Sequence, residues 1–333
     1  MITFFRKELT QSKGCKTFKH MILAYNLSPT IKDTLAKIDA LNNKLLLIPL
    51  SLKNEQRLKW ETTIARIYWS LILSANPLSK NHMAKILVSH DNKKREGRQV
   101  INYQKALTEI KDEWLVTRRN VTLNSLLSLY KTCCKIISPQ DISLKKRKEL
   151  NMLFDFLNQS TEHPVIQAGI SQIEMIEIAP FDDGNGRMAR LMPYLYLYKN
   201  GYNCRDMLVL EEYFRRDLVG LKLAIENVTK SGNLTYWLEY FVKGFHSQLE
   251  KALAGVEDIR FTTDISSSYF KLNERQKEII ALLESPGSRI TNKMVKKSFG
   301  TSQITASRDL AKLLNLEIVF VHGKGRSTYY TKA

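Results

Sequence analysis

The middle of the chain holds a short glycine-containing turn between two apolar segments with helical spacing. Residues 164–178 read as one helix, and the turn over residues 180–186 places Gly184 and Gly186 on either side of an asparagine. A second apolar helix is expected to begin near Arg187. Two apolar helices joined by so short a turn favour a mainly α fold.

Most of the remaining chain also shows the spacing of amphipathic helices. We expect further helices over residues 28–54, 56–74, 102–110, 123–137, 144–157 and 236–253. The second of these should end near Asn76-Pro77, because a proline disfavours helical backbone in the residue before it. The polar, basic residues 91–98 predict a turn or a helix edge. Pro193 should remove one hydrogen bond from its helix or kink it.

The last 62 residues follow a different pattern. The expected elements are helices at Glu274–Leu283 (capped by Asn273), Asn292–Phe299 (closed by Gly300) and Ser302–Leu314, then strands at 318–322 and 328–331 around a Gly-Lys-Gly-Arg turn. Three helices and a basic hairpin predict a winged helix-turn-helix domain. The predicted organisation is an N-terminal helical region (1–100), a helical core domain (101–255), a linker (256–270) and the winged helix (271–333).

The chain is strongly basic, with a formal net charge of +18. Such a surplus favours polyanionic partners such as nucleic acid, although a generally solvated basic surface remains the alternative. The four cysteines form no CxxC pair, and the adjacent Cys133-Cys134 is a poor disulfide framework. Reduced cysteines, no apolar run long enough to span a bilayer and no secretory pattern at the start predict a cytoplasmic protein without a membrane partner.

The central turn has the chemistry of an anion-binding loop. Glycine permits backbone conformations that point successive N–H groups into one concavity, and the following helix adds the positive end of its dipole. Arg187 and Arg190 lie three residues apart, so both should project from the first helical turn beside a phosphate. Asp183 could hold Mg²⁺ against the phosphate oxygens. From these residues alone, a surface turn with two exposed arginines stays open as the alternative.

The order Pro180-Phe181-x-Asp183-Gly184-Asn185-Gly186-Arg187-x-x-Arg190 resembles the signature of the Fic family, His-Pro-Phe-x-Asp/Glu-Gly-Asn-Gly-Arg-x-x-Arg. The flanking residues 163–168 and 70–78 resemble the helix before this motif and the family's N-terminal helix. Residues 305–310 and 325–330 are similar to the winged-helix tail of many members. The resemblance covers nearly the whole chain and implies a Fic-type helical bundle with a C-terminal winged helix.

The resemblance also implies an activity and its residues. Fic enzymes transfer AMP from ATP, with Mg²⁺, to a hydroxyl of a target protein. In this chain Asp183 would carry the metal, and the phosphates would be held by Phe181, Gly184, Asn185, Gly186, Arg187 and Arg190. Family members often form dimers, so the resemblance implies a homodimer as well.

Three residues depart from the family pattern, and one of them is Gln172, which stands where a second histidine is common in the helix before the motif. Ala179 stands where the catalytic histidine of the motif is expected. A methyl group cannot accept a proton, and losing a general base typically costs about 10²–10⁴-fold in rate. Ser74 stands where many members carry an inhibitory glutamate that pairs with the second motif arginine. The sequence therefore predicts a weak or inactive pseudoenzyme that still binds a nucleotide or phosphate.

The tail carries the predicted DNA contacts. Residues 271–332 contain twelve Lys and Arg against five Asp and Glu. The expected recognition helix and wing would present Gln303, Thr305, Arg308, Lys312, Lys324 and Arg326 to DNA. Ile304, Leu310, Leu313 and Leu314 should face the core. Arg308 could instead be structural, paired with Asp309 or with a helix end, and the whole module could instead serve protein docking or dimerisation.

The sequence is consistent with three different functions. The first is a regulatory protein that joins a degenerate nucleotide-binding domain to a DNA-binding tail. The second is an active AMP-transferase, or another nucleotidyl or phosphodiester transferase, with its base relocated. His163 lies too early in its helix to be that base, and we expect it to cap or pack the helix instead. The third is a scaffold whose two modules bind proteins.

Overall fold

A computed structural model describes residues 2–3, 24–74, 78–89, 94–134, 137–264, 272–283, 288–316 and 318–332. The chain divides into two compact units, residues 1–257 and residues 258–333. Each unit has its own hydrophobic core. The predicted helix end at Asn76-Pro77 lies outside the described residues.

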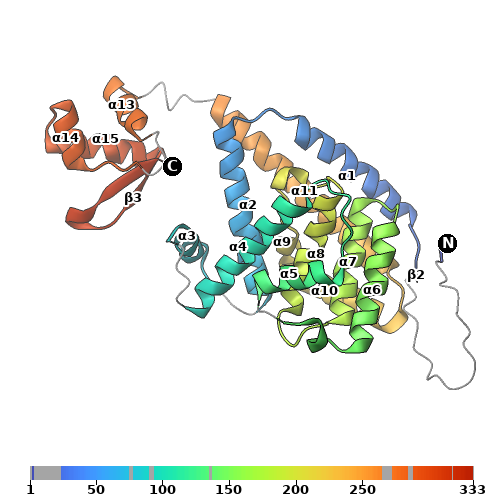
Figure 1. Cartoon of the computed structure of the whole chain (residues 1–333). Helices are drawn as coiled ribbons and strands as arrows, with labels where there is room; N and C mark the ends of the chain where they lie inside the picture. Colours follow the sequence, from blue (N-terminus) through green and yellow to red (C-terminus); the bar gives the residue numbers. More distant parts are fainter. Residues whose placement is uncertain are drawn as a thin grey trace, which may run out of the picture. The chain divides into compact units, whose positions relative to one another are not determined.

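The first unit is built almost entirely of helices (Figure 1). Two short antiparallel strands, β1 (Ile2–Thr3) and β2 (Ala24–Tyr25), precede them. The helices are α1 (Pro29–Leu47), α2 (Leu52–Leu73), α3 (Lys80–Ser89), α4 (Arg95–Trp114), α5 (Leu123–Cys133), η1 (Pro139–Asp141), α6 (Leu144–Gln159), α7 (Pro164–Ile178), α8 (Asn185–Lys199), η2 (Cys204–Asp206), α9 (Leu210–Arg216), α10 (Leu218–Ser231) and α11 (Thr235–Asp264). The mainly α fold expected from the sequence is confirmed.

The single helix predicted over residues 28–54 is wrong, because the structure has two helices there. α1 ends at Leu47, and the next residue, Ile48, is extended (φ −69°, ψ 120°). Pro49 explains this end, since the residue before a proline is driven out of the helical region. The hydroxyl of Ser51 then caps α2, which starts before the predicted residue 56.

Two other helices, α4 and α11, extend beyond their predicted bounds. α4 begins at Arg95, so part of the polar stretch 91–98 is helical, and it extends to Trp114. α3 was not predicted, and α11 runs to Asp264, inside the predicted linker 256–270. Packing against neighbouring helices extends a helix beyond the segment where its own apolar pattern is clear.

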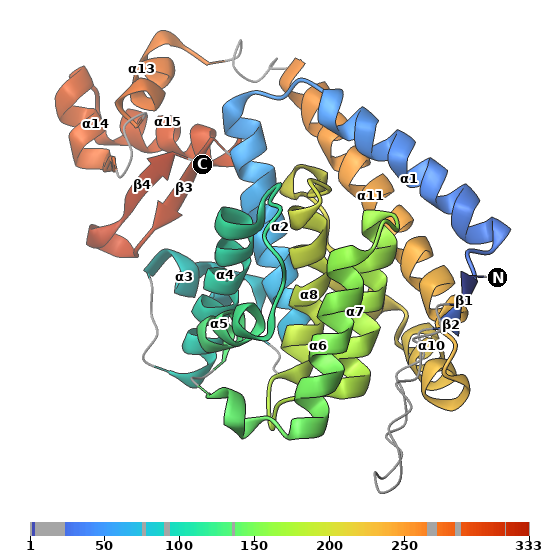
Figure 2. The ribbon, with the colours of Figure 1, turned by 45° about the vertical axis from the view of Figure 1, so that its right-hand side comes forward.

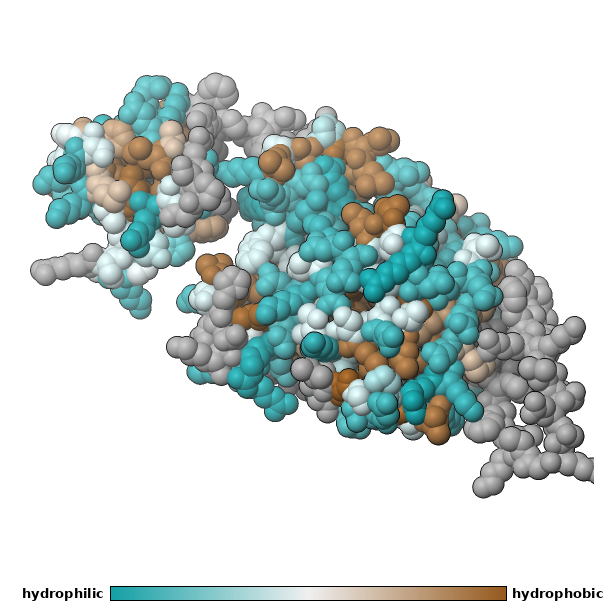
Figure 3. All heavy atoms as spheres, in the orientation of Figure 1, coloured by the Kyte–Doolittle hydropathy of each residue, from teal (hydrophilic) through white to brown (hydrophobic). Residues whose placement is uncertain are grey.

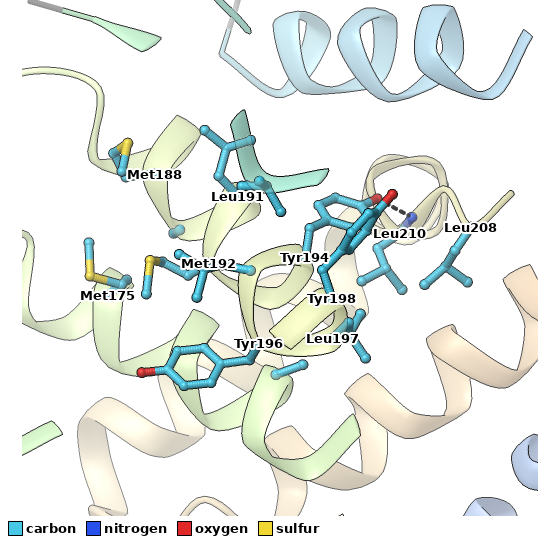
Figure 4. Packing of buried hydrophobic residues seen from close by; sticks show 14 of the residues in the cluster. Met175, Met188, Leu191, Met192, Tyr194, Tyr196, Leu197, Tyr198, Leu208 and Leu210 are labelled. Atoms are coloured by element: carbon cyan, nitrogen blue, oxygen red, sulfur yellow. Dashed lines mark hydrogen bonds between the residues drawn. The ribbon is translucent and has the colours of Figure 1, made fainter. Parts of the chain in front are cut away.

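α7 and α8 form the centre of the first unit, and both ribbon views place them side by side with α4, α6 and α11 around them (Figures 1 and 2). Nearly all their side chains are buried. Figure 4 shows side chains of α8 within this core, where the hydroxyl of Tyr194 accepts a hydrogen bond from the N–H of Leu210 at 3.2 Å. α8 continues through the buried Pro193, so the proline removes a donor without ending the helix.

The second unit has the element order that the sequence predicts. It contains α13 (Glu274–Leu282), α14 (Asn292–Phe299), α15 (Gln303–Asn315), β3 (Val319–His322), η3 (Gly325–Ser327) and β4 (Tyr329–Lys332). β3 and β4 pair antiparallel. Asn273 caps α13, and Gly300, with φ +60°, closes α14.

One prediction about which residues form the core of the second unit is wrong. Ala306, Leu310 and Leu313 of α15 are buried, as their spacing of four and three residues requires. Ile304 is 65% exposed, although we expected it in the core. It lies two residues before Ala306, which is more than half a turn around the helix, so it points away from that face.

The surface view in Figure 3 is mainly hydrophilic, with apolar side chains in separate groups. Large apolar side chains that are exposed among the described residues include Leu47 and Leu52, which flank the turn between α1 and α2. Among the helices of the described ranges, none combines the length and apolar character required to cross a bilayer.

Candidate functional site

The candidate site begins where α7 ends. Ala179 adopts left-handed backbone (φ +41°, ψ 64°), and its N–H donates to the carbonyl of Met175 at 3.2 Å. A left-handed residue commonly ends a helix, although an alanine is strained there. The ammonium of Lys146, in the first turn of α6, donates to the carbonyl of Ala179 at 2.7 Å. Sequence reasoning missed Lys146, because it lies 33 residues before its partner.

The side chain of Asn185 holds the loop closed. Its Oδ1 accepts from the N–H of Phe181 at 2.9 Å, and its Nδ2 donates to the carbonyl of Phe181 at 2.5 Å. Gly184, with φ +80°, then turns the chain into α8. The asparagine of the motif therefore positions the loop backbone through Phe181.

The end of α5 forms the wall behind this loop. The ring of Tyr130 stacks on Phe181 with centroids 3.8 Å apart, and its hydroxyl donates to the carbonyl of Asp183 at 2.9 Å. A Cβ placed on Gly184 would lie only 2.7 Å from the Sγ of Cys134. Glycine is thus required at residue 184 both by its backbone angle and by this close approach.

The N-terminus of α8 faces the loop without a side-chain cap. Its N-cap residue, Gly184, has no side chain that could accept a hydrogen bond from the first turn. The first N–H groups of a helix have no partner within the helix, and they carry the positive end of its dipole. Gly186, in this first turn, is exposed.

The two motif arginines have different partners. Arg187 is largely buried, and its Nη2 donates to the Asp183 carboxylate at 3.2 Å. Arg190 turns toward α2, where its Nε donates to the Ser70 hydroxyl at 2.8 Å and its Nη2 to the Ser70 carbonyl at 3.0 Å. The same Nη2 donates to the Ser74 hydroxyl at 2.6 Å. The structure therefore brings Ser74 to the second motif arginine, and it adds Ser70 as a partner with two hydrogen bonds.

A buried polar network lies behind Arg190. Tyr103 lies close to Arg190 and donates to the Glu211 carboxylate at 3.3 Å, and Tyr194 donates to its other oxygen at 2.7 Å. The Arg66 guanidinium stacks 4.3 Å over the Tyr194 ring. Burial raises the pKa of Glu211 and lowers the pKa of Arg190. The network places the Arg190 guanidinium in a low-dielectric environment, where its charge is weakly screened.

Asp183 suits a metal that a phosphate helps to bind. Its side chain is 75% exposed and forms an ion pair with the Arg187 guanidinium at 3.2 Å. Mg²⁺ keeps several waters and needs one or two carboxylates plus phosphate oxygens, so a single exposed carboxylate fits this type of site. Within the described part of the chain, no three His, Cys, Asp or Glu side chains gather as a protein-only metal site.

The predicted DNA-contacting residues lie on α15 and on the turn between β3 and β4. Gln303, Arg308 and Lys324 are exposed, whereas Thr305 and Lys312 are half-buried. The Arg326 side chain lies outside the described residues. Thr305 is part of the helix cap, since its Oγ1 is hydrogen-bonded to the Ser302 hydroxyl at 2.9 Å.

Asp309 does not pair with Arg308, which was the structural alternative for that arginine. Its buried carboxylate accepts from the Nε of Arg275 at 2.6 Å and from the Nε2 of Gln276 at 2.7 Å. These bonds join α13 to α15. Arg308 is exposed on a face of α15 that does not pack into the core.

His163 has the capping role expected for it. Its Nδ1 accepts from the N–H of Val165 at 3.2 Å at the start of α7, and its Nε2 lies 3.0 Å from the Asp39 carboxylate. Because Nδ1 is an acceptor, Nε2 carries the proton and donates to Asp39. These contacts hold His163 at the end of α7 opposite to Ala179.

Known proteins resemble this chain in sequence. Residues 104–197 match the family model described as Fic/DOC family. A "Protein adenylyltransferase Fic" from Nematostella vectensis is 23% identical over 199 residues, covering 51% of this chain and 46% of that protein. A protein of the same name from Drosophila willistoni is 25% identical over 192 residues, covering 50% and 38%. The chain thus spans less than half the length of these curated relatives.

Solved structures resemble it in fold. A Fic family protein from Desulfovibrio desulfuricans G20 superposes with a TM-score of 0.63 at 17% identity, covering 93% of this chain and 98% of that one. Fic-1 from C. elegans gives a TM-score of 0.56 at 21% identity, covering 67% and 71%. The family model therefore places a Fic/DOC domain at residues 104–197, and the motif residues at the start of α8 lie inside it.

Proposed function

We propose that this protein binds a nucleotide, or another phosphorylated ligand, at the loop over residues 180–190 and transfers AMP weakly or not at all. In this proposal it is a regulatory pseudoenzyme, and its C-terminal unit binds DNA. The observation that carries the proposal is the uncapped N-terminus of α8, with Arg187 and Arg190 beside it and Ala179 at the place of a base.

Several kinds of donor support anion binding at this loop. The exposed Gly186 and its neighbours in the first turn of α8 offer backbone N–H groups. Arg187 and Arg190 add two guanidinium groups, which suit phosphate oxygens because they can donate two parallel hydrogen bonds. Asp183 would hold Mg²⁺ between itself and the phosphates, and the metal would neutralise part of their charge. The name of the curated relatives, protein adenylyltransferase, makes ATP with Mg²⁺ the first ligand to test.

The surroundings of Ala179 support the proposal that AMP transfer is weak or absent. Its methyl group cannot take the proton of an attacking hydroxyl. The side chain that contacts its backbone is Lys146, and in that contact the ammonium is the donor. Phosphate contacts come from amides and guanidinium groups, so losing the base removes catalysis and leaves ground-state binding.

The order of elements and the charge of the C-terminal unit support the proposal that it binds DNA. Three helices followed by a hairpin are the elements of a winged helix, and residues 271–332 carry a net charge of +7. Gln303 and Arg308 on α15 and Lys324 beside the hairpin are exposed. Such residues suit base edges and phosphates.

Calorimetry with ATP and Mg²⁺, run beside a transfer assay with labelled AMP, tests the first part of the proposal. We expect binding without label on any protein. Robust labelling of serine, threonine or tyrosine would identify an active transferase with a relocated base and overturn the proposal. The Ala179→His variant should gain labelling, and Ala179→Gln is its matched control, because it adds a polar side chain that cannot act as a base.

A further inference from the structure

Two adjacent cysteines lie at the end of α5, directly behind the anion-binding loop. Cys133 is 1% exposed, Cys134 is half-buried, and neither is in a disulfide. The two thiols are hydrogen-bonded to each other. This hydrogen bond, together with burial, raises the pKa of Cys133 well above its ordinary value.

The Cys134 sulphur is in contact range of the loop. The Cβ position of Gly184 is 2.7 Å from that sulphur and 3.3 Å from Nη2 of Arg187, so sulphur and guanidinium flank the same point. The N–H of Cys134 donates to the carbonyl of Tyr130 at 2.8 Å, and Tyr130 supports the loop through Phe181 and Asp183. The last turn of α5 therefore carries both the loop's support and the dithiol.

We propose that Cys133 and Cys134 form an oxidation-sensitive dithiol that controls ligand binding at this loop. Reactive cysteines sit in electropositive, partly exposed surroundings, which describes Cys134 beside Arg187. Cys134 attacks hydrogen peroxide, which gives a sulfenic acid and water. The buried Cys133 thiol then attacks the Cys134 sulphur. An S–S bond forms, the S–O bond breaks and a second water leaves, so the two thiols lose two electrons and the peroxide gains them.

Closing this disulfide forces the backbone to move. Consecutive Cα atoms across a trans peptide are about 3.8 Å apart. Disulfide-bonded residues usually have Cα atoms about 4.4–6.8 Å apart. The end of α5 must therefore distort, which breaks the bond from Cys134 to Tyr130 and shifts the wall that holds Gly184. A strained disulfide is also easily reduced, so the change is reversible by thiols.

The test treats the full chain with hydrogen peroxide and measures three quantities. Peptide mass spectrometry detects the loss of two hydrogens in the peptide that contains both cysteines. Hydrogen exchange follows the amides of residues 179–190. Calorimetry measures ATP affinity, and only this readout rests on the proposed function. We expect the disulfide, faster exchange in the loop and a fall in affinity of about 5–150-fold, the usual range of coupling between sites. A thiol reductant should reverse all three.

The variants separate the dithiol from general oxidation. Cys134→Ser keeps the size of the side chain, and it should fold normally and lose all three responses. Cys15→Ser is the matched control and should keep them. The proposal is overturned if peroxide forms no link between Cys133 and Cys134. It is equally overturned if the link forms and loop exchange stays unchanged. A protein that shows the link and the exchange change after oxidation, but binds no ATP when reduced, contradicts the proposed function alone.

Discussion

Arg190 of α8 and Ser70 of α2 are joined by two hydrogen bonds, of 2.8 Å from Nε to the hydroxyl and 3.0 Å from Nη2 to the carbonyl, across 120 residues of sequence. With the bond to Ser74, three donors of this guanidinium are directed at the last turn of α2. A ligand phosphate at Arg190 therefore competes with hydroxyl and carbonyl groups, which are neutral.

Replacing one of these neutral partners by a carboxylate should weaken ligand binding. In Ser74→Glu the new charge can pair with Arg190, and a hydrogen bond to a charged group contributes about 1.5–3 kcal/mol. We expect ATP affinity to fall by about tenfold in calorimetry. Ser74→Gln is the matched control, since it has nearly the same size without the charge, and it should lose much less. Equal losses in both variants would point to steric blocking instead of charge.

The left-handed backbone of Ala179 predicts a stabilising substitution. Glycine adopts φ near +41° without strain, so Ala179→Gly should raise the free energy of unfolding by about 1 kcal/mol. Chemical denaturation measures the change. Ala168→Gly, in the buried interior of the same helix, should instead destabilise the protein by at least about 1 kcal/mol. If Ala179→Gly also destabilises, the strain assigned to this residue is wrong.

Because the carboxyl group of Glu174 is buried, we expect the free energy of unfolding to depend on pH. Its side chain is 6% exposed, and burial, followed by the charges of Glu177 and Glu149, raises its pKa from 4.5 to about 7. Between these two pH values the folded state retains a proton that the unfolded state releases, so stability falls as the pH rises through this window. Glu174→Gln should remove this decline and add stability on the order of 3 kcal/mol above pH 7.

Denaturation curves at pH 5, near the lower end of this window, and at pH 8, above its upper end, measure this effect. Glu177→Gln is the control, because that carboxylate is exposed and accepts a hydrogen bond from Thr229 at 2.7 Å. It should leave most of the pH dependence in place. An unchanged slope in Glu174→Gln would show that other groups cause the decline.

The exposed cations of the C-terminal unit predict a salt-dependent interaction. If Arg308 and Lys324 contact phosphates, each alanine variant should weaken DNA binding and reduce the slope of log affinity against log salt by about 1. Lys222→Ala, an exposed lysine of α10 in the first unit, should change neither quantity. Self-association that is insensitive to salt would instead favour a docking or dimerisation module.

Local signals in the sequence account for much of the fold. Apolar spacing, Asn273 as a cap and Gly300 as a helix end predict the second unit closely, because each depends on neighbours within a few residues. Where a boundary depends on burial against another helix, as at α4 and α11, or on a single proline at residue 49, the predictions were less accurate.

The sequence by itself determined the loop: Gly184, Asn185 and the two arginines stand at fixed spacing, and helix geometry places them at one N-terminus. Only the tertiary structure decided what surrounds it. Ser70, Tyr130 and Lys146 reach the loop across 120, 53 and 33 residues, respectively. No local periodicity encodes such contacts, because they arise when α2, α5 and α6 pack around α7 and α8 to bury their apolar faces.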